Sequence, residues 1–299
     1  MSSTDLKKAI SILDAGGVVG IPTETVYGLA ARINLSDAID KIFTTKQRPS
    51  FDPLIVHVAS IKQAANSTSF WPMHAEVLAN TFWPGPLTLV LPKAESISSK
   101  ITSGLDSVGL RCPNHEVTLE LIRHCGPLAA PSANRFGKTS PTQKSHVDSE
   151  FNNEVYTIDG GPCQIGIEST VAGIFDDHIE IYRPGAITAS MIKEVVDVEV
   201  VVKESPVSPG TLKHHYMPDV PMYLSLKDHP RELESLKYQT LVLNSDPAIA
   251  ARELYQKMRE AAATNGVEAI LLKRLSNQSG ELWDGIWNRV SKAITQELV

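Results

Sequence analysis

The sequence predicts an α/β protein in which a larger domain on a mixed sheet precedes a small doubly wound α/β domain. Short β-branched runs alternate with amphipathic stretches along the 299 residues, without the strict strand–helix–strand order of a parallel sheet. A proline-rich segment at 205–218 interrupts this alternation, because proline fixes φ and resists helix. We therefore predict a larger domain at 1–202, a linker at 203–221 and a small domain at 222–299.

In the larger domain, the first predicted helix spans 4–15, between a threonine cap and the pair Gly16-Gly17. The run "GVVGIP" follows as a short buried strand, which Pro22 closes. Further helices are predicted at 36–46, 73–82, 114–125 and 188–195, and further strands at "PLIVHV", "LTLVLP", "GPLAAPSAN", "EVYTIDGG" and "STVAGIF". The small domain is predicted from "TLVLNSD", a helix at 247–264, "GVEAILLKR" and a helix at 280–294, with no dinucleotide fingerprint.

The composition is that of an ordinary globular protein, with 42% apolar residues and a net charge of −6. No stretch approaches the roughly 18 uncharged apolar residues of a membrane helix, and the first residues, "MSSTDLKKAI", lack the apolar region of a signal peptide. We therefore expect a cytoplasmic protein. The acidic balance counts against a constitutive nucleic-acid binder, since Lys and Arg supply most nonspecific affinity for phosphates.

The cysteines, Cys112, Cys125 and Cys163, are odd in number and widely spaced. They form no CxxC or Cys/His pattern, so we expect no metal bound by protein ligands. We interpret them as reduced, packed thiols, with a catalytic thiol as the less favoured alternative.

Polar residues follow several predicted strands, at positions where open α/β sheets bind ligands. Thr23 lies in "IPTETVYGLA", and Lys46 and Arg48 lie in "TTKQRP", where two cations near a helix end suit an anion. Taken singly, these features also fit a capped turn and a solvated helix end. His57 in "IVHV" equally fits a strand-end histidine that binds no ligand.

Other strand ends add Arg111 in "GLRCP" and the turn "AAPSANRFGKTSPT". A partly buried arginine needs an anionic or carbonyl partner, and small residues in the turn let backbone N–H groups approach phosphates. The turn is not a P-loop, and an Asx-type turn explains it equally well. With Ser169 and Arg183, four strand ends thus indicate a pocket for an anionic ligand. There is no Ser-His-Asp order, HExxH or obvious carboxylate pair to support a hydrolase.

Seven motifs in order, "PTETVYGL", "KQRP...DPLIVHV", "WPGPLTLVL", "GLDSVGLRCP", "APSAN...SPT", "DGG...GIESTV" and "RPG", together resemble the YrdC-like family of L-threonylcarbamoyladenylate synthases. The linker and the small domain are similar to the two-domain form of that family. Its lysine, arginine, serine and asparagine signature falls on Lys46, Arg48, Ser132 and Asn134. The resemblance implies a YrdC-like domain with a twisted mixed sheet.

The resemblance also implies an enzyme, a nucleotidyltransferase that makes threonylcarbamoyl-AMP and pyrophosphate from L-threonine, bicarbonate and ATP. It implies Mg²⁺ with the ATP phosphates and transfer of the product to a tRNA-modifying complex that acts at adenosine 37. Direct tRNA binding would then be weak. The implied threonine-binding residues are Thr23, His57, Arg111, Ala130 and Ser169, and the implied ATP-binding residues are Lys46, Arg48, Ser107, Ser132, Asn134, Ser140, Arg183 and Tyr216. Lys46 and Arg48 are the implied catalytic residues, which stabilise charge at the α-phosphate.

In the two-domain form the linker passes over the active site. This chain keeps the His-Tyr-x-Pro end of that linker at His215, Tyr216 and Pro218, and has Lys213 where many relatives place an aromatic residue. Two alternatives stay open: a double-stranded RNA or tRNA-binding module, and an enzyme that uses a related carbamoyl-adenylate. The absence of CxxC pairs in the sequence counts against the second.

Overall fold

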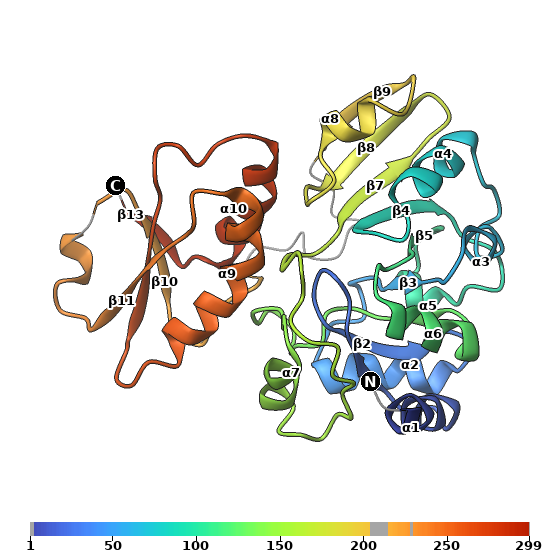
Figure 1. The fold of residues 1–299 in the computed structure, drawn as a ribbon, viewed down its shortest axis with the longest axis horizontal. Helices are drawn as coiled ribbons and strands as arrows, with labels where there is room; N and C mark the ends of the chain where they lie inside the picture. The colour runs from blue at the N-terminus through green and yellow to red at the C-terminus, as the bar shows by residue number, and fades with distance from the viewer. Residues whose placement is uncertain (1–2, 204–214, 228–229, 299) are drawn as a thin grey trace.

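The computed structural model describes residues 3–203, 215–227 and 230–298. Within these residues the chain forms a nine-stranded mixed sheet and a separate four-stranded parallel sheet (Figure 1). The predicted fold class is therefore confirmed. No helix of the described part of the chain is long and apolar enough to span a bilayer.

The larger sheet has the strand order β1-β2-β6-β3-β5-β4-β7-β8-β9. Its strands are β1 (Val19–Ile21), β2 (Gly28–Arg32), β3 (Ile55–His57), β4 (Leu87–Pro92), β5 (Ser107–Arg111), β6 (Leu128–Ala129), β7 (Thr170–Ile174), β8 (His178–Arg183) and β9 (Glu199–Val202). β3 and β5 are parallel neighbours, and the register places His57 beside Arg111. Because parallel strands end at the same edge, these two side chains reach one side of the sheet together.

Helices cover both faces of this sheet (Figure 1). They are α1 (Ser3–Asp14), α2 (Ser36–Lys46), α3 (Ile61–Ala65), α4 (Met73–Phe82), α5 (Ser99–Thr102), α6 (Glu116–Cys125), α7 (Lys144–Glu150) and α8 (Ala189–Lys193). On β2, Ala31 packs toward the α2 and α4 side, whereas Ala30 packs toward α1 and α6. Neighbouring strand residues point to opposite faces, so both faces bury apolar side chains at about 1.5–3 kcal/mol for each large one.

Several predicted elements differ from the observed ones. The first helix begins at Ser3, so Thr4 lies inside it and is not its cap. The segment "EVYTIDGG" forms an isolated bridge from Thr157 to Gly20 instead of a strand. β2 was not predicted, because its sequence, "GLAAR", has weak β-propensity and is held by pairing on both sides.

The smaller sheet has the order β11-β12-β10-β13, and all its strand pairs are parallel. Its elements are β10 (Met222–Ser225), η1 (Arg231–Leu233), β11 (Tyr238–Val242), α9 (Pro247–Ala262), β12 (Ala269–Lys273), α10 (Glu281–Ala293) and β13 (Gln296–Leu298). Helices α9 and α10 lie between this sheet and the larger domain (Figure 1). Ile270 and Leu272 pack beneath these helices, while Leu271 packs on the other face with Leu233 and Leu298.

The two domains approach each other closely at two glycines. A Cβ added at Gly166 would lie 2.4 Å from Cα of Arg252 on α9, and one added at Gly285 on α10 would lie 3.3 Å from Cα of Gly185. Contacts this tight require backbone against backbone. The domain limits 1–202, 203–221 and 222–299 stay a prediction, since 204–214 lie outside the described residues.

Candidate active site

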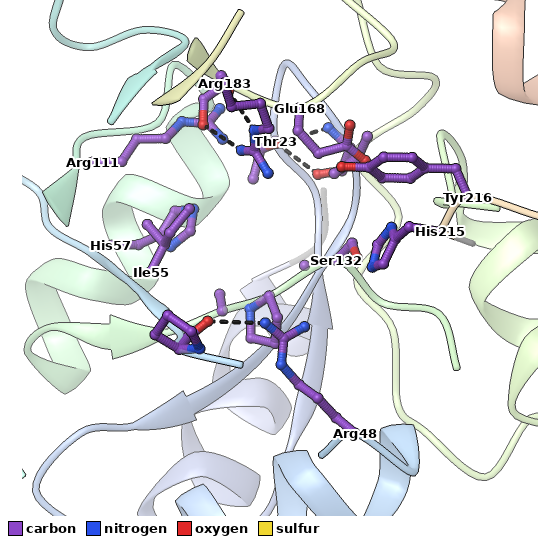
Figure 2. Close-up of a pocket in the computed structure, with 16 residues that line it drawn as sticks. Thr23, Arg48, Ile55, His57, Arg111, Ser132, Glu168, Arg183, His215 and Tyr216 are labelled. Atoms are coloured by element: carbon purple, nitrogen blue, oxygen red, sulfur yellow. Dashed lines mark hydrogen bonds between the residues drawn. The ribbon is translucent and has the colours of Figure 1, made fainter. Parts of the chain in front are cut away.

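A cavity of about 50 Å³ lies at the strand ends where the sequence predicted an anion pocket (Figure 2). Nine predicted site residues line it together with Glu168 and His215. The nine are Thr23, Arg48, His57, Arg111, Ala130, Ser132, Ser169, Arg183 and Tyr216. Ligand pockets are typically about 300–1,000 Å³, so this cavity would have to widen to accept a ligand of that size.

Arg111 is held in the wall by a buried ion pair. Its Nη2 lies 2.8 Å from Oε1 of Glu24, and its Nε donates to the carbonyl of Gly85. Glu24 in turn accepts a hydrogen bond from the backbone N–H of Asn114. The guanidinium is thus fixed in position before any ligand binds, because each partner is itself held.

His57 lies beside Arg111 and is 4% exposed. Burial, with a smaller contribution from the charge of Arg111, lowers the pKa of His57 to about 3. The imidazole is therefore neutral at pH 7 and adds no positive charge to the cavity. Its use to a ligand is as a hydrogen-bonding ring.

Thr23 has two roles in the turn after β1. Its Oγ1 donates to the carbonyl of Val26 and accepts from the N–H groups of Thr25 and Val26. This is the turn-closing role that the sequence left open, and the side chain also lines the cavity.

Lys46 and Arg48 lie at the end of α2, and both are buried. Arg48 pairs with Asp52, with Nη2 2.9 Å from Oδ1, and donates to the carbonyl of Pro53. Lys46 lies behind the cavity wall and donates from Nζ to the carbonyls of Ser132 and Asn134, each at 2.5 Å. Burial and the neighbouring Arg48 charge hold the pKa of Lys46 well below its usual range.

Ser132 and Asn134 are therefore joined to Lys46 through their backbone oxygens, so the signature residues lie together. The amide Nδ2 of Asn134 donates to the carbonyls of Arg135 and Lys138 and closes the turn. Asn134 does not line the cavity in this conformation. Ser107 lies at the start of β5 and lines an adjacent cavity of about 20 Å³, which shares Pro53 with the larger one.

Arg183, at the end of β8, lies on the opposite side of the cavity from Arg48 (Figure 2). Its Nε donates to the carbonyl of Ser169 at 3.1 Å, and its Nη2 lies 3.3 Å from the Ser169 hydroxyl. The hydroxyl of Ser169 also bonds Thr88 at 2.8 Å. Arg183 and Ser169 thus form one rigid unit across β7 and β8.

Glu168 is a charged residue of the cavity that the sequence did not identify. Its carboxylate accepts a hydrogen bond from Ser140, at 2.6 Å, which explains why this predicted ATP contact does not itself line the cavity. The signal was an acid directly before Ser169 in "GIESTV", in a region otherwise poor in acids. Sequence alone could not say whether that acid faced the ligand or a protein partner.

Tyr216 and His215 cover the cavity from the end of the predicted linker (Figure 2). Tyr216 is 1% exposed, has φ of 64° and stacks on Tyr255 of α9 at 5.7 Å between ring centroids. Burial lowers the pKa of His215 to about 3. The predicted contact Lys213 lies outside the described residues.

The three cysteines are buried and unpaired. Burial raises the pKa of Cys112 to about 11 and that of Cys163 to about 12, so both thiols are protonated at neutral pH. A protonated thiol is a poor nucleophile. None of the three lines the cavity.

Two family models match the chain. The Sua5_yciO_yrdC model, described as telomere recombination, matches residues 11–185. The Sua5_C model, described as the C-terminal domain of threonylcarbamoyl-AMP synthase, matches residues 187–294.

Curated relatives agree with these models. The threonylcarbamoyl-AMP synthase of Bacillus subtilis is 45% identical over 226 residues, which cover 73% of this chain and 65% of that protein. The threonylcarbamoyl-AMP synthase of Pyrococcus abyssi is 39% identical over 247 residues, which cover 79% of this chain and 72% of that protein. The aligned region thus spans about two thirds of the first relative's length.

Among solved structures, P. abyssi Sua5 complexed with L-threonine superposes with a TM-score of 0.89 at 33% identity. The match covers 99% of this chain and 97% of that chain, so it includes both domains. The cavity described above therefore lies in a fold shared over its whole length with that protein. The chain belongs to the Sua5/YciO/YrdC family, in the two-domain form that includes the threonylcarbamoyl-AMP synthases.

Proposed function

We propose that the protein is an L-threonylcarbamoyladenylate synthase, a nucleotidyltransferase that joins L-threonine, bicarbonate and ATP. The observation that carries this proposal is the placement of three buried arginines, Arg48, Arg111 and Arg183, around one cavity. All three substrates are anionic or carry a carboxylate, and fixed cations offset their mutual repulsion. The names of the B. subtilis and P. abyssi relatives support the same activity.

The reaction consists of two bond-forming steps. The threonine amine adds to bicarbonate with loss of water and gives a carbamate. A carbamate oxygen then bonds to the α-phosphorus of ATP, and the bond from that phosphorus to pyrophosphate breaks. Little acid–base chemistry is needed in the second step, so the enzyme contributes mainly position and fixed charge.

We assign the threonine end of the cavity to Thr23, His57, Arg111, Ala130 and Ser169. Arg111 is the carboxylate-binding group, because its guanidinium is already oriented by Glu24 and Gly85. The complex of P. abyssi Sua5 with L-threonine supports a threonine site in this fold.

We assign the nucleotide end to a second set of residues. Arg48 and Lys46 stabilise charge at the α-phosphate. To do so, Arg48 must leave its present partner Asp52, and Lys46 must leave the two backbone carbonyls to which it now donates. The other members of the set are Ser107, Ser132, Asn134, Ser140, Arg183 and Tyr216. This exchange of partners would widen the cavity, because Pro53 and Ser132, whose carbonyls now accept from Arg48 and Lys46, both line it.

Mg²⁺ enters this proposal as part of the MgATP substrate. The described residues include no cluster of three His, Cys, Asp or Glu that could hold a metal ion. The carboxylates near the cavity, Glu24, Asp52 and Glu168, are each paired with an arginine. These residues therefore fit an ion held by phosphate oxygens and water better than one held by the protein.

Pyrophosphate release tests the proposal directly. We expect release with all three substrates and less than about one hundredth of that rate when L-threonine or bicarbonate is omitted. Mass spectrometry should find threonylcarbamoyl-AMP in the complete mixture. ATP hydrolysis that does not depend on threonine would contradict the proposal. We further propose transfer of the product to a tRNA-modifying complex in the cytoplasm; the net charge of −6 weighs against a tRNA-binding module as the main function.

A further inference from the structure

Glu168 is a carboxylate in the wall of a cavity that otherwise presents cations and neutral groups. It is 7% exposed, and among the described residues that line the cavity it is the one acid. An uncompensated carboxylate at this place would repel the carboxylate and phosphate groups of the proposed substrates. Its partners therefore bear on substrate binding.

Within the described residues, Glu168 accepts hydrogen bonds from the side chains of Ser140, Tyr255 and Arg289, and the last two belong to the small domain. Tyr255 on α9 donates its hydroxyl to Oε2 at 2.9 Å, and Arg289 on α10 donates Nε to the same oxygen at 3.1 Å. Ser140 of the larger domain donates to Oε1 at 2.6 Å. The carboxylate is thus held at the domain interface through both oxygens.

Arg289 is fully buried, at 0% exposure, and its other bonds fix its position. Its Nη2 donates to the backbone carbonyl of Glu168 at 2.9 Å, and its Nη1 donates to the carbonyls of Gly285 and Pro184. A buried guanidinium is expensive without a carboxylate partner, and the ion pair described for it is with Glu168. Gly285, one turn before Arg289 on α10, lies against the backbone of Gly185 in the larger domain, so α10 is close to that domain beside this pair.

We propose that Arg289 and Tyr255 are positioning residues of the active site, through which the small domain neutralises Glu168 and keeps the cavity attractive to anions. The inference rests on the proposed function. It gives the small domain a part in substrate binding that acts through Glu168, since neither Arg289 nor Tyr255 lines the cavity.

In the part of the chain that the structure describes, the charged and titratable groups that face Glu168 come from four segments. They are Arg183 on β8, Arg289 on α10, Tyr255 on α9, and His215 and Tyr216 before β10. Burial raises the pKa of Glu168, but Arg289, Arg183 and the Ser140 hydroxyl outweigh it and bring the pKa to about 2. Removing Arg289 leaves Arg183 as the one facing cation in this group, and Arg183 also bonds Ser169.

The first test compares substrate binding in Arg289→Met and in the double variant Arg289→Met/Glu168→Gln. We expect calorimetry to show L-threonine bound at least tenfold more weakly by the single variant, with a matching rise in KM. The double variant should recover to within threefold of the wild type, because no carboxylate remains to be neutralised. Equal weakening in both variants would overturn the inference.

A matched control separates charge compensation from loosening of the interface. Arg259 on α9 also crosses the interface and pairs with Glu150 at 3.2 Å, away from the active-site cavity. Arg259→Met should keep the threonine KM within twofold. If Arg259→Met raised the KM for threonine as much as Arg289→Met does, any weakened interface would reduce binding. That result would refute the specific role of Arg289 in neutralising Glu168.

The second test needs no substrate. In the wild type, the partners of Glu168 lower its pKa from 4.5 to about 2. The ionised carboxylate therefore adds to the unfolding free energy above pH 4.5, and this contribution is lost only as the pH falls toward 2. In Arg289→Met the pKa of Glu168 in the folded protein rises, so lowering the pH protonates the carboxylate and removes its buried charge. We expect the Tm deficit of the variant to be larger at pH 7.5 than at pH 5; an equal deficit contradicts the pairing.

The wild type is measured first, so that the two proposals can fail separately. Absence of threonine-dependent pyrophosphate release in the wild type refutes the proposed function and the substrate part of this inference. The pH series then judges the pairing of Arg289 with Glu168 alone. Release in the wild type with no effect of Arg289→Met refutes the inference and leaves the proposed function standing.

Discussion

Arg111 and Glu24 form a buried ion pair across the wall of the cavity, with 2.8 Å between Nη2 and Oε1 and side chains that are 5% and 4% exposed. Breaking one partner of such a pair costs about 3–5 kcal/mol, because the other charge stays buried. We predict that Glu24→Gln lowers the unfolding free energy by this order and weakens threonine binding. Urea denaturation and calorimetry measure the two effects.

The control for this prediction is the exposed pair of Arg32 and Asp14, whose side chains are 25% and 51% exposed. Asp14→Asn should change the unfolding free energy by less than about 1 kcal/mol, as is usual for surface pairs. If Glu24→Gln lowers the unfolding free energy as little as Asp14→Asn does, the inference that Glu24 fixes the orientation of Arg111 is wrong.

Lys46→Met should reduce pyrophosphate release at least about 100-fold, the loss expected when a preorganised donor to developing charge is removed. It should also lower the Tm, because two carbonyls lose their common donor. Lys41→Met, on the same helix, removes an exposed lysine and should keep full turnover. A Lys46→Met enzyme with near-normal turnover would remove Lys46 from the mechanism.

Tyr216→Phe separates a role at the nucleotide from a role in packing. Tyr216 is fully buried against Tyr255, so Tyr216→Ala would lose about 3–5 kcal/mol of packing as well as any ligand contact. The phenylalanine keeps the ring and removes only the hydroxyl beside Arg183. We expect the KM for ATP to rise severalfold with the Tm nearly unchanged; an unchanged KM would assign Tyr216 to packing.

Gly166→Ala tests the closeness of the two domains. Its φ of 83° disfavours alanine by roughly 1–2 kcal/mol, and its Cβ would also meet the backbone of α9 at 2.4 Å. Gly104 has φ of 84° but no atom within 4 Å of an added Cβ. The difference in Tm between Gly166→Ala and Gly104→Ala therefore reports the interface contact, and equal values would contradict it.

Acid should destabilise the protein through its buried histidines. The pKa of His57 is lowered to about 3 and that of His146 to about 4, both by burial first. Because these values lie below the unfolded value of about 6.5, their contribution is present above pH 6.5 and is lost as pH falls toward 4 and 3. The wild type should lose more unfolding free energy than His57→Asn between pH 7.5 and pH 5, by about 1–2 kcal/mol. The variant His124→Asn, at an exposed position, should lose as much as the wild type.

Much of the fold followed from apolar periodicity alone. The predicted helices at 36–46 and 73–82 match α2 and α4, because each has a full amphipathic repeat and a clear end. Strand predictions failed where pairing rather than composition decides the structure. β2 is a strand rich in glycine and alanine that was not predicted, whereas the predicted strand at 154–161 forms an isolated bridge at Thr157. Local propensity cannot report a hydrogen-bonding partner distant in sequence.

The sequence by itself determined which types of residue form the cavity. Strand ends and the cations that follow them are local features, and the motifs carry these residues in order. Their charge state was decided by the tertiary structure. The ion pair of Arg111 with Glu24 forms only when the sheet assembles, and that of Glu168 with Arg289 only when both domains meet, whereas Arg48 and Asp52 are a local i,i+4 pair. The strength of a charge depends on its burial and its neighbours, and Glu168 and Arg289 are 121 residues apart in the chain.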